Sequence, residues 1–243
     1  AQEEGRQQER DGDEPIPAPS GGGTAHPAAT DEEPEEIIVM SIASQIEFYR
    51  NELPSNVKLV AVSKFKPSSA IMDAYQAGQR VFGENRPQEL AAKAKELPSD
   101  IEWHFIGHLQ TNKVKLVVPC ASVIESVDSE RVLAAIDSCA ASMGKVTDCF
   151  VEVHVAEEET KTGFSPEEAL ELVSRAAEKY PNVHLCGIMA MATFTSDEAQ
   201  VRAEFARAAQ VCRQCGFENL SMGMSEDYKI AIEEGATIVR IGS

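Results

Sequence analysis

The sequence has no long hydrophobic run and few basic residues for its length. Its 243 residues include 22 Lys and Arg against 40 Asp and Glu, a formal net charge of −18. No apolar run approaches the roughly 18 residues that span a bilayer, and the chain does not open with a basic segment followed by an apolar one. A general binder of nucleic acid or anionic membranes needs a basic surface. We therefore expect a cytoplasmic protein with neither nucleic acid nor membrane as a partner.

Nucleotide-binding loops and complete zinc motifs are also absent. No GxGxxG follows any strand-like segment, and there is no Walker-type loop, which disfavours an open doubly wound sheet. Among the six cysteines, Cys212 and Cys215 form one CxxC pair, but no second pair and no nearby histidine completes a zinc set. The chain is large enough to bury a core without disulfides, so we expect reduced thiols and no metal site.

The N-terminal segment differs in composition from the rest. Residues 1–36 hold 11 acidic and 2 basic residues, 5 of the 12 prolines, 5 of the 15 glycines and no aromatic residue. Such a segment cannot bury enough apolar surface to offset the entropy of ordering it. We expect a disordered acidic tail over residues 1–38 and one folded domain over residues 40–243.

Within the folded domain, short apolar segments alternate with helix-like segments. The strand-like segments are Val57–Ser63, Arg80–Gly83, Ile101–Gly107, Ser122–Val127, Val146–Val155, His184–Ala192, Asn219–Met224 and Thr237–Ile241. The helix-like segments are Ser41–Leu53, Ser68–Ala77, Pro87–Leu97, Ser129–Met143, Pro166–Tyr180, Asp197–Cys215 and Ser225–Glu234. Alternating strands and helices indicate a parallel sheet, and eight such units predict a closed (β/α)₈ TIM barrel.

In such a barrel the active face collects residues at the carboxyl ends of the strands. Lys64 follows the first strand-like segment. A lysine held beside an apolar run loses hydration, which favours the neutral amine that attacks a carbonyl. The alternative is a lysine whose ammonium group extends from the strand end into water.

The last two units suggest a phosphate site and a buried cation. Ser225 follows the seventh strand and is expected in the first turn of a helix, where a hydroxyl and free N–H groups can hold a phosphate; Gly242 and Ser243 add donors beside it. The alternative is a turn with a helix cap. Arg240 interrupts an apolar strand and needs an acceptor, either a buried carboxylate or a ligand. With Lys64 for a carbonyl, this set fits pyridoxal phosphate.

These residues resemble the pyridoxal phosphate homeostasis proteins, single-domain relatives of the alanine racemase barrel. The resemblance runs from about Leu59 to Ser243 and rests on several segments in order. They are Ala61–Lys64, Phe82–Asn85 with Gln88 and Glu89, Trp103–Gly107 with Leu109, Gln110, Asn112 and Lys113, Lys161 before Gly163, Ser221–Ser225 with Asp227, and Val239–Gly242.

The resemblance implies a role for each matching residue. Lys64 would hold the cofactor as an internal aldimine, and Arg240 would face the pyridine nitrogen. The phosphate would be held by Ser225, Gly242 and Ser243. Asn85 and His104 would line the pocket, and Lys161 would be an accessory residue.

The sequence departs from the family pattern in three places. Arg86 stands where relatives usually have an aromatic residue, and His154 where asparagine is common, so we expect a more basic rim. The chain also stops at Ser243, where relatives continue with a closing helix. We therefore expect a fragment that leaves apolar surface of the barrel uncovered.

The function that this resemblance implies is intracellular pyridoxal phosphate homeostasis. We expect a monomer that buffers the cofactor or delivers it to apo-enzymes and turns over no substrate. The alternative is an amino-acid racemase, which needs acid–base groups on both faces of the substrate; none of the four tyrosines lies at a predicted strand end. A third reading is a protein-interaction module with the acidic tail as its docking segment, which leaves Lys64 and Arg240 unexplained.

Overall fold

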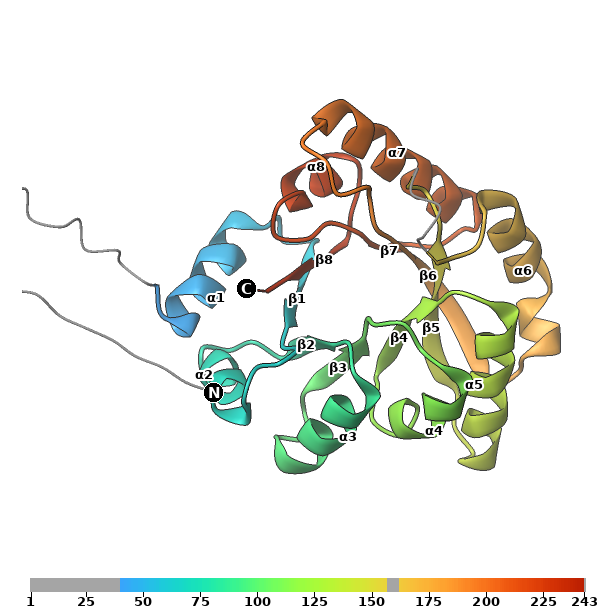
Figure 1. Cartoon of the computed structure of the whole chain (residues 1–243), viewed down its shortest axis with the longest axis horizontal. Coiled ribbons are helices and arrows are strands. Elements are labelled where there is room, and N and C mark those ends of the chain that lie inside the picture. The colour runs from blue at the N-terminus through green and yellow to red at the C-terminus, as the bar shows by residue number, and fades with distance from the viewer. Residues whose placement is uncertain (1–39, 157–161, 243) are drawn as a thin grey trace, which may run out of the picture. The chain divides into compact units, whose positions relative to one another are not determined.

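Eight parallel strands close into a barrel in the order in which they follow one another along the chain (Figure 1). The strands are β1 Lys58–Val62, β2 Val81–Glu84, β3 Glu102–Phe105, β4 Val123–Val127, β5 Thr147–Val153, β6 Val183–Ala190, β7 Asn219–Ser221 and β8 Ile238–Ile241. β1 pairs with both β2 and β8, which closes the ring. The predicted (β/α)₈ barrel is confirmed.

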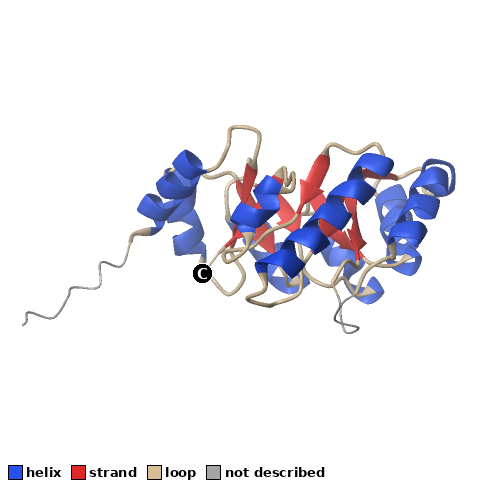
Figure 2. Ribbon diagram, turned by 90° about the horizontal axis from the view of Figure 1, so that it is seen from above, coloured by secondary structure: helices blue, strands red, loops and turns tan. Residues whose placement is uncertain are grey.

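The helices lie around the outside of the strands (Figure 2). They are α1 Ile42–Glu52, α2 Ser68–Gln76, α3 Pro87–Glu96, α4 Val114–Val117, α5 Glu130–Ser142, α6 Pro166–Lys179, α7 Glu198–Gln214 and α8 Tyr228–Glu233, with a 3₁₀ turn η1 at Thr111–Lys113. The computed structural model describes residues 40–156 and 162–242, so the predicted tail over 1–38 lies outside the described residues. No helix in the described residues has the length and apolar composition needed to cross a membrane.

Most predicted boundaries agree with the structure to within one or two residues, but three regions differ. The seventh strand was predicted to reach Met224, and it ends at Ser221. The sequence predicted no helix between the third and fourth strands, where η1 and α4 lie. The predicted helix over Ser225–Glu234 was wrong at its start, because α8 begins only at Tyr228. Asp227 Oδ1 accepts the Met224 N–H at 2.6 Å and holds residues 224–227 in a turn.

The main core lies between the strands and the surrounding helices. Fully buried residues such as Phe82, Phe105 and Leu133 fill this layer, and burying each such side chain stabilises the fold by about 1.5–3 kcal/mol. A smaller cluster fills the barrel itself. It consists of Val60, Phe150, Met189 and Ile238, which come from strands around the ring.

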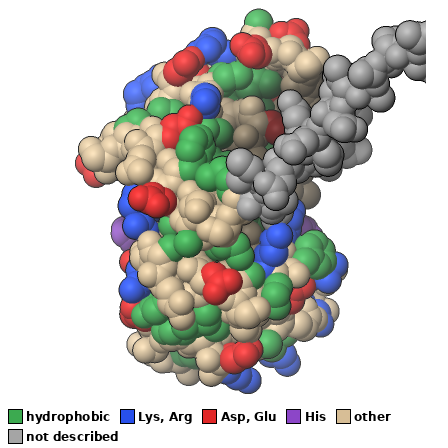
Figure 3. All heavy atoms as spheres, turned by 90° about the vertical axis from the view of Figure 1, so that its left-hand side faces the viewer, with side chains coloured by type: hydrophobic (Ala, Val, Ile, Leu, Met, Phe, Trp, Pro, Cys, Tyr) green, Lys and Arg blue, Asp and Glu red, His purple; other side chains and the backbone are tan. Residues whose placement is uncertain are grey.

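Helix α1 precedes the first strand and packs between α8 and α2 at the side where the barrel closes (Figure 1). Tyr49 of α1 meets Tyr228 of α8 edge to face, with ring centroids 5.9 Å apart. Arg50 donates to the carbonyl of Ala77 after α2 at 3.1 Å. On this side of the molecule, charged side chains of both signs are scattered among hydrophobic ones (Figure 3).

Candidate functional site

The carboxyl ends of β8, β1 and β2 bring most of the predicted cofactor residues to one mouth of the barrel. Pairing joins Ala61 to Ile241 on one side of β1 and Val62 to Gly83 on the other. Lys64 follows β1 by two residues, so its turn lies between the segments that carry Gly242 and Asn85. A Cβ at Gly242 would approach the Val62 carbonyl to 2.6 Å, so glycine permits this close passage.

Ser225 lies beside the end of β8, as the sequence predicted. Its Oγ donates to the Gly242 carbonyl at 3.2 Å, so the hydroxyl and the β8 loop share one place on the mouth. Ser225 is exposed and lies in the turn before α8, not in the first turn of a helix. Gly223 precedes it with φ +92, and a Cβ there would come within 2.6 Å of the Ala231 side chain. The predicted residues Ser243 and Lys161 lie outside the described residues.

Lys64 is exposed, so of the two interpretations that the sequence left open the structure agrees with the lysine whose side chain extends from the strand end into water. Its strand ends at Val62, and the buried residue is its neighbour Ser63. Ser63 Oγ donates to Glu84 Oε1 at 2.6 Å, and the Ser63 carbonyl accepts from Lys93 Nζ at 2.9 Å. The backbone that carries Lys64 is therefore fixed while its side chain reaches solvent.

A buried ion pair supports this turn. Lys93 Nζ of α3 lies 2.7 Å from Glu84 Oε1 at the end of β2, with side-chain exposures of 9% and 0%. Glu89, one helical turn before Lys93, accepts from its Nζ at 3.4 Å and from the Phe65 backbone N–H at 3.0 Å. The sequence alone indicates no such role for these residues, because α3 contacts the Lys64 turn only in the folded chain. In the sequence, the signal for them is a pair of opposite charges, Glu89 and Lys93, one helical turn apart on the helix that follows the second strand.

The residue after Lys64 has an unusual backbone. Phe65 has φ +62, a conformation that costs a non-glycine residue of order 1–3 kcal/mol. The Arg86 guanidinium lies 4.2 Å from the centroid of the Phe65 ring, and Arg86 also pairs with Glu89 at 3.5 Å. The Arg86 charge is therefore shared with an aromatic ring and a carboxylate, and the more basic rim remains a prediction.

A buried polar network crosses the barrel below the mouth. His104 Nδ1 of β3 lies 2.5 Å from Glu125 Oε1 of β4, and Ser221 Oγ of β7 donates to Glu125 Oε2 at 2.5 Å. Arg240 donates to Ser221 Oγ at 2.7 Å and to the Ala190 carbonyl at 3.1 Å, with Glu125 Oε2 at 3.9 Å. The sequence left two partners open for Arg240, a buried carboxylate or a ligand, and the structure shows the buried carboxylate, Glu125.

Burial, hydrogen bonds and neighbouring charges shift the pKa values of the buried charged groups in the barrel. Burial by itself raises the pKa of Glu125, but the His104 hydrogen bond, the Arg240 charge and the Ser221 hydroxyl outweigh it and hold that pKa below its usual value. Burial lowers the pKa of Arg240, and the Glu125 charge opposes that shift. Glu152, also buried, has a pKa raised by burial, although Thr162 donates to it at 2.8 Å.

Besides Glu84 Oε2, three buried polar atoms near the mouth have no hydrogen-bond partner within the described part of the chain. They are Asn85 Oδ1, His104 Nε2 and His154 Nδ1. A buried polar group without a partner costs free energy, so each favours an external partner. Two of the three belong to predicted cofactor residues, and the third is His154, where the sequence departs from the family pattern.

The chain matches the family described as "Alanine racemase, N-terminal domain" over residues 37–243. The pyridoxal phosphate homeostasis protein of Aquifex aeolicus is 41% identical over 193 residues, which cover 76% of this chain and 84% of the relative. The protein of the same name from Schizosaccharomyces pombe is 37% identical over 213 residues, 83% of this chain and 87% of the relative.

Solved structures agree. PipY of Synechococcus elongatus PCC7942 without PLP has a TM-score of 0.77 and 36% identity, and covers 83% of this chain and 97% of its own. The structure of PipY with PLP bound has a TM-score of 0.75, 35% identity and the same coverage. Alanine racemase from Bartonella henselae has a TM-score of 0.66 at 15% identity over 82% of this chain and 56% of its own, a similarity of fold alone.

Proposed function

The chain belongs to the family of pyridoxal phosphate homeostasis proteins, built on the alanine racemase N-terminal domain, and from this premise we propose that it binds pyridoxal phosphate at the mouth formed by β8, β1 and β2. It acts in the cytoplasm as a monomer that buffers the cofactor or delivers it to apo-enzymes. The six free cysteines fit a reducing compartment.

The observation that carries this proposal is the fixed turn of Lys64 between Asn85 and Gly242. When bound, pyridoxal phosphate supplies an aldehyde to which a lysine amine bonds covalently. Lys64 is the first lysine after β1, and its exposed side chain is free to turn toward that aldehyde. The Ser225 hydroxyl and the Gly242 and Ser243 N–H groups hold the phosphate. Asn85 Oδ1 and His104 Nε2, which lack partners, line the pocket.

Arg240 explains why such a site would catalyse few reactions of amino acids. A guanidinium keeps its proton at ordinary pH, so it donates a hydrogen bond to an unprotonated ring nitrogen and disfavours a protonated one. Ser221, the Ala190 carbonyl and Glu125 hold Arg240 in place. Pyridoxal phosphate stabilises carbanions best with its ring nitrogen protonated. Arg240 therefore favours a carrier that does not consume amino acids.

The racemase alternative needs a second acid–base group at the mouth. Tyr49, Tyr75 and Tyr228 lie on α1, α2 and α8, and Tyr180 follows α6, so no tyrosine lies at a strand end. Steady exchange of the α-proton of added amino acids by the purified protein, at rates typical of enzymes, would favour the racemase. Absence of exchange with full cofactor binding supports the carrier.

The test of cofactor binding is borohydride reduction of the protein mixed with pyridoxal phosphate. We predict that the label is recovered on Lys64 and that Lys64→Ala loses both the label and the absorption of the lysine-bound cofactor. Lys66→Ala is the matched control, because Lys66 is also exposed in the same turn. Recovery of the label mainly on Lys66 or Lys161 would contradict the assignment.

Lys161 is proposed as an accessory residue that accepts or helps release the cofactor. The segment before Lys161 is acidic, so the alternative is that the Lys161 side chain is solvated and pairs with these carboxylates. Transfer of pyridoxal phosphate to an apo-enzyme separates the two views. If Lys161→Ala leaves both the transfer rate and the affinity unchanged, Lys161 has no role in delivery.

A further inference from the structure

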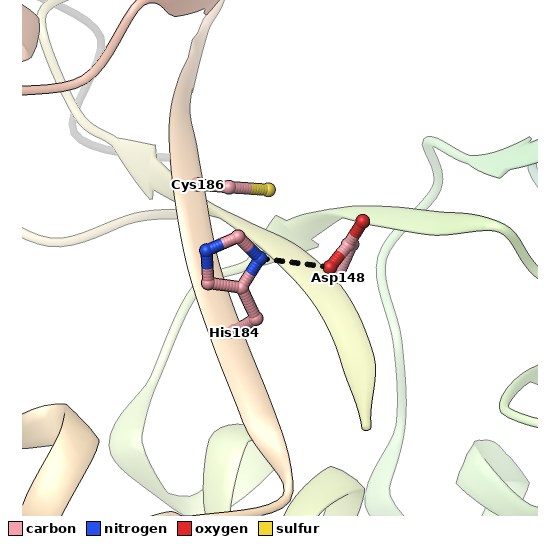
Figure 4. A group of neighbouring side chains, drawn as sticks. All are labelled: Asp148, His184 and Cys186. Atoms are coloured by element: carbon pink, nitrogen blue, oxygen red, sulfur yellow. Dashed lines mark hydrogen bonds and ion pairs between the residues drawn. The ribbon is translucent and has the colours of Figure 1, made fainter. Parts of the chain in front are cut away.

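Three metal-binding side chains converge at the mouth of the barrel opposite Lys64. Asp148 lies near the start of β5, and His184 and Cys186 lie near the start of β6. Figure 4 shows the His184 ring facing Asp148, with the Cys186 sulfur beside them. One ligand atom from each side chain lies within 4.8 Å of the others, and His184 Nδ1 is 2.9 Å from Asp148 Oδ1.

The strand pairing explains why these side chains meet. Asp148 is paired with His184, so the two side chains lie across from each other on one face. The register then shifts, because Cys149 pairs with Leu185 and Phe150 pairs with Gly187. Cys186 is therefore the extra residue of a β-bulge, a feature that re-aims a side chain.

The bulge is built into the sequence. A Cβ at position 187 would lie 2.7 Å from the Phe150 ring, so only glycine can occupy this position without a shift. Asn219 Nδ2 of β7 donates to the Cys186 carbonyl at 2.8 Å and fixes the bulged backbone from the other side. The convergence thus depends on strands and not on a loop, which makes the geometry reproducible.

We propose that Asp148, His184 and Cys186 form a Zn²⁺ site with water as the fourth ligand. Carboxylate, imidazole and thiolate are the three ligand types that zinc prefers, at about 2.0–2.3 Å in tetrahedral geometry. Mg²⁺ and Ca²⁺ require more oxygen ligands than this cluster offers. Small rotations of the side chains bring atoms within 4.8 Å of one another onto a common metal.

Charge and access also fit a zinc ion. Zn²⁺ binds the thiolate, and the thiol proton leaves to solvent. Thiolate and carboxylate then balance the two charges of the ion. Asp148 and His184 have side-chain exposures of 50% and 63%, which leaves an entry path.

The site has a structural role, distinct from the cofactor mouth. It joins the starts of β5 and β6, at the end of the barrel where fixed residues contribute to stability and not to chemistry. A sequence search by spacing does not find it, because the aspartate lies 36 residues before the histidine. The CxxC pair that the sequence singled out, Cys212 and Cys215, takes no part in it.

The test is a titration of the full-length protein with Co²⁺, a spectroscopic substitute for Zn²⁺. We expect stoichiometric binding with a thiolate-to-cobalt charge-transfer band that Zn²⁺ abolishes. Cys186→Ser removes the band, and Asp148→Asn or His184→Asn weakens binding more than about tenfold. Cys215→Ser, the matched control from the CxxC pair, leaves the titration unchanged. A band that survives in Cys186→Ser, or no band in the wild type, overturns the proposal.

Thermal unfolding supplies a second measurement that does not depend on colour. A ligand that binds the folded state alone raises the Tm, so Zn²⁺ should raise the Tm of the wild type and of Cys215→Ser but not of Cys186→Ser. Loading with pyridoxal phosphate should leave the Co²⁺ titration unchanged, because the two sites lie at opposite ends of the barrel. Loss of Co²⁺ binding in Lys64→Ala would place the metal at the cofactor mouth and refute the site.

Discussion

The turn that carries Lys64 is held by side chains from a neighbouring strand and helix. Ser63 is anchored to Glu84 and Lys93, and the Phe65 N–H is held by Glu89. Phe65 keeps a positive φ, so these contacts offset a backbone strain of order 1–3 kcal/mol. A residue that bonds covalently to a ligand gains affinity when its backbone is already in place.

We predict that Glu89→Ala weakens pyridoxal phosphate binding by about tenfold, because the Phe65 N–H loses its acceptor and the turn relaxes; tenfold corresponds to about 1.4 kcal/mol. Glu89→Gln keeps an acceptor at the same place and should retain most of the affinity. Equilibrium titration of both variants measures the effect. Equal affinity of Glu89→Ala and the wild type would show that the turn does not depend on this contact.

The ion pair below the turn gives a prediction for stability. Lys93→Met leaves Glu84 buried without a counter-charge, and breaking such a pair costs about 3–5 kcal/mol. Urea unfolding should show this loss for the single variant. The double variant Glu84→Leu with Lys93→Met removes both charges and should recover most of it. A double variant as unstable as the single one would mean that packing, not charge, dominates the effect.

At the scale of elements, the sequence predicted the strands and most of the helices, because short apolar segments alternate with helix-like segments along the chain. It missed η1 and α4, since a 3₁₀ turn followed by a four-residue helix is too short to show helical periodicity. The sequence also predicted Ser225 in a helix, because the local pattern does not show that the Asp227 side chain holds residues 224–227 in a turn before the helix begins.

The candidate site was predictable only in part for the same reason. Lys64 and Arg240 follow or interrupt apolar strands, which a sequence displays locally. Glu125 and Ser221 are 96 residues apart along the chain and meet only when the barrel closes. Their pairing, and hence the carboxylate behind Arg240, depends on the closed ring and leaves no local pattern.

Contact between helices α5 and α6 gives a pH-dependent prediction. Glu130 of α5 accepts from Arg175 and Lys179 of α6 and from Tyr180 just after it, and the bonds from Lys179 and Tyr180 lower its pKa from 4.5 to about 2. Because the folded pKa is below the unfolded one, ionised Glu130 stabilises the fold above about pH 4.5. That contribution is lost as the pH falls toward about 2.

Glu130→Gln should therefore lose less stability than the wild type on acidification through this range. Urea unfolding at several pH values measures the difference. Glu167→Gln removes an acidic side chain from the first turn of α6, outside the Glu130 contacts, and serves as the matched control. An unchanged pH dependence in Glu130→Gln would show that the contacts with α6 add no stability.

Across the whole molecule, the barrel interior is layered from one mouth to the other. Asp148, His184 and Cys186 lie at the amino-terminal mouth, and the apolar cluster around Phe150 separates them from the polar layer above. Glu152 lies two residues beyond Phe150 on β5, and Arg240 two beyond Ile238 on β8, so both enter that polar layer. The apolar layer keeps the two mouths chemically independent.

The polar layer holds two buried glutamates whose titrations should affect stability with opposite sign. Glu125 is ionised against His104, Ser221 and Arg240, and its lowered pKa makes its charge stabilising above the unfolded value. Burial raises the pKa of Glu152, so the folded state favours its neutral acid. Stability then falls as the pH rises from the unfolded value of 4.5 through the higher folded one.

We predict that Glu152→Gln is more stable than the wild type at pH 8 and that this advantage shrinks as the pH falls toward about 4.5, because the folded wild type then takes up its proton. The amide oxygen of glutamine can still accept from Thr162, so the variant removes the buried charge and keeps the hydrogen bond. Glu125→Gln, equally buried on the neighbouring strand, is the matched contrast and should be less stable than the wild type at pH 8, since it leaves Arg240 without its nearest carboxylate. Urea unfolding of the cofactor-free proteins measures both. A loss of stability in Glu152→Gln at pH 8 would mean that Glu152 is ionised and that Arg240 balances both carboxylates, so that the interior would carry one more negative charge beneath the cofactor mouth.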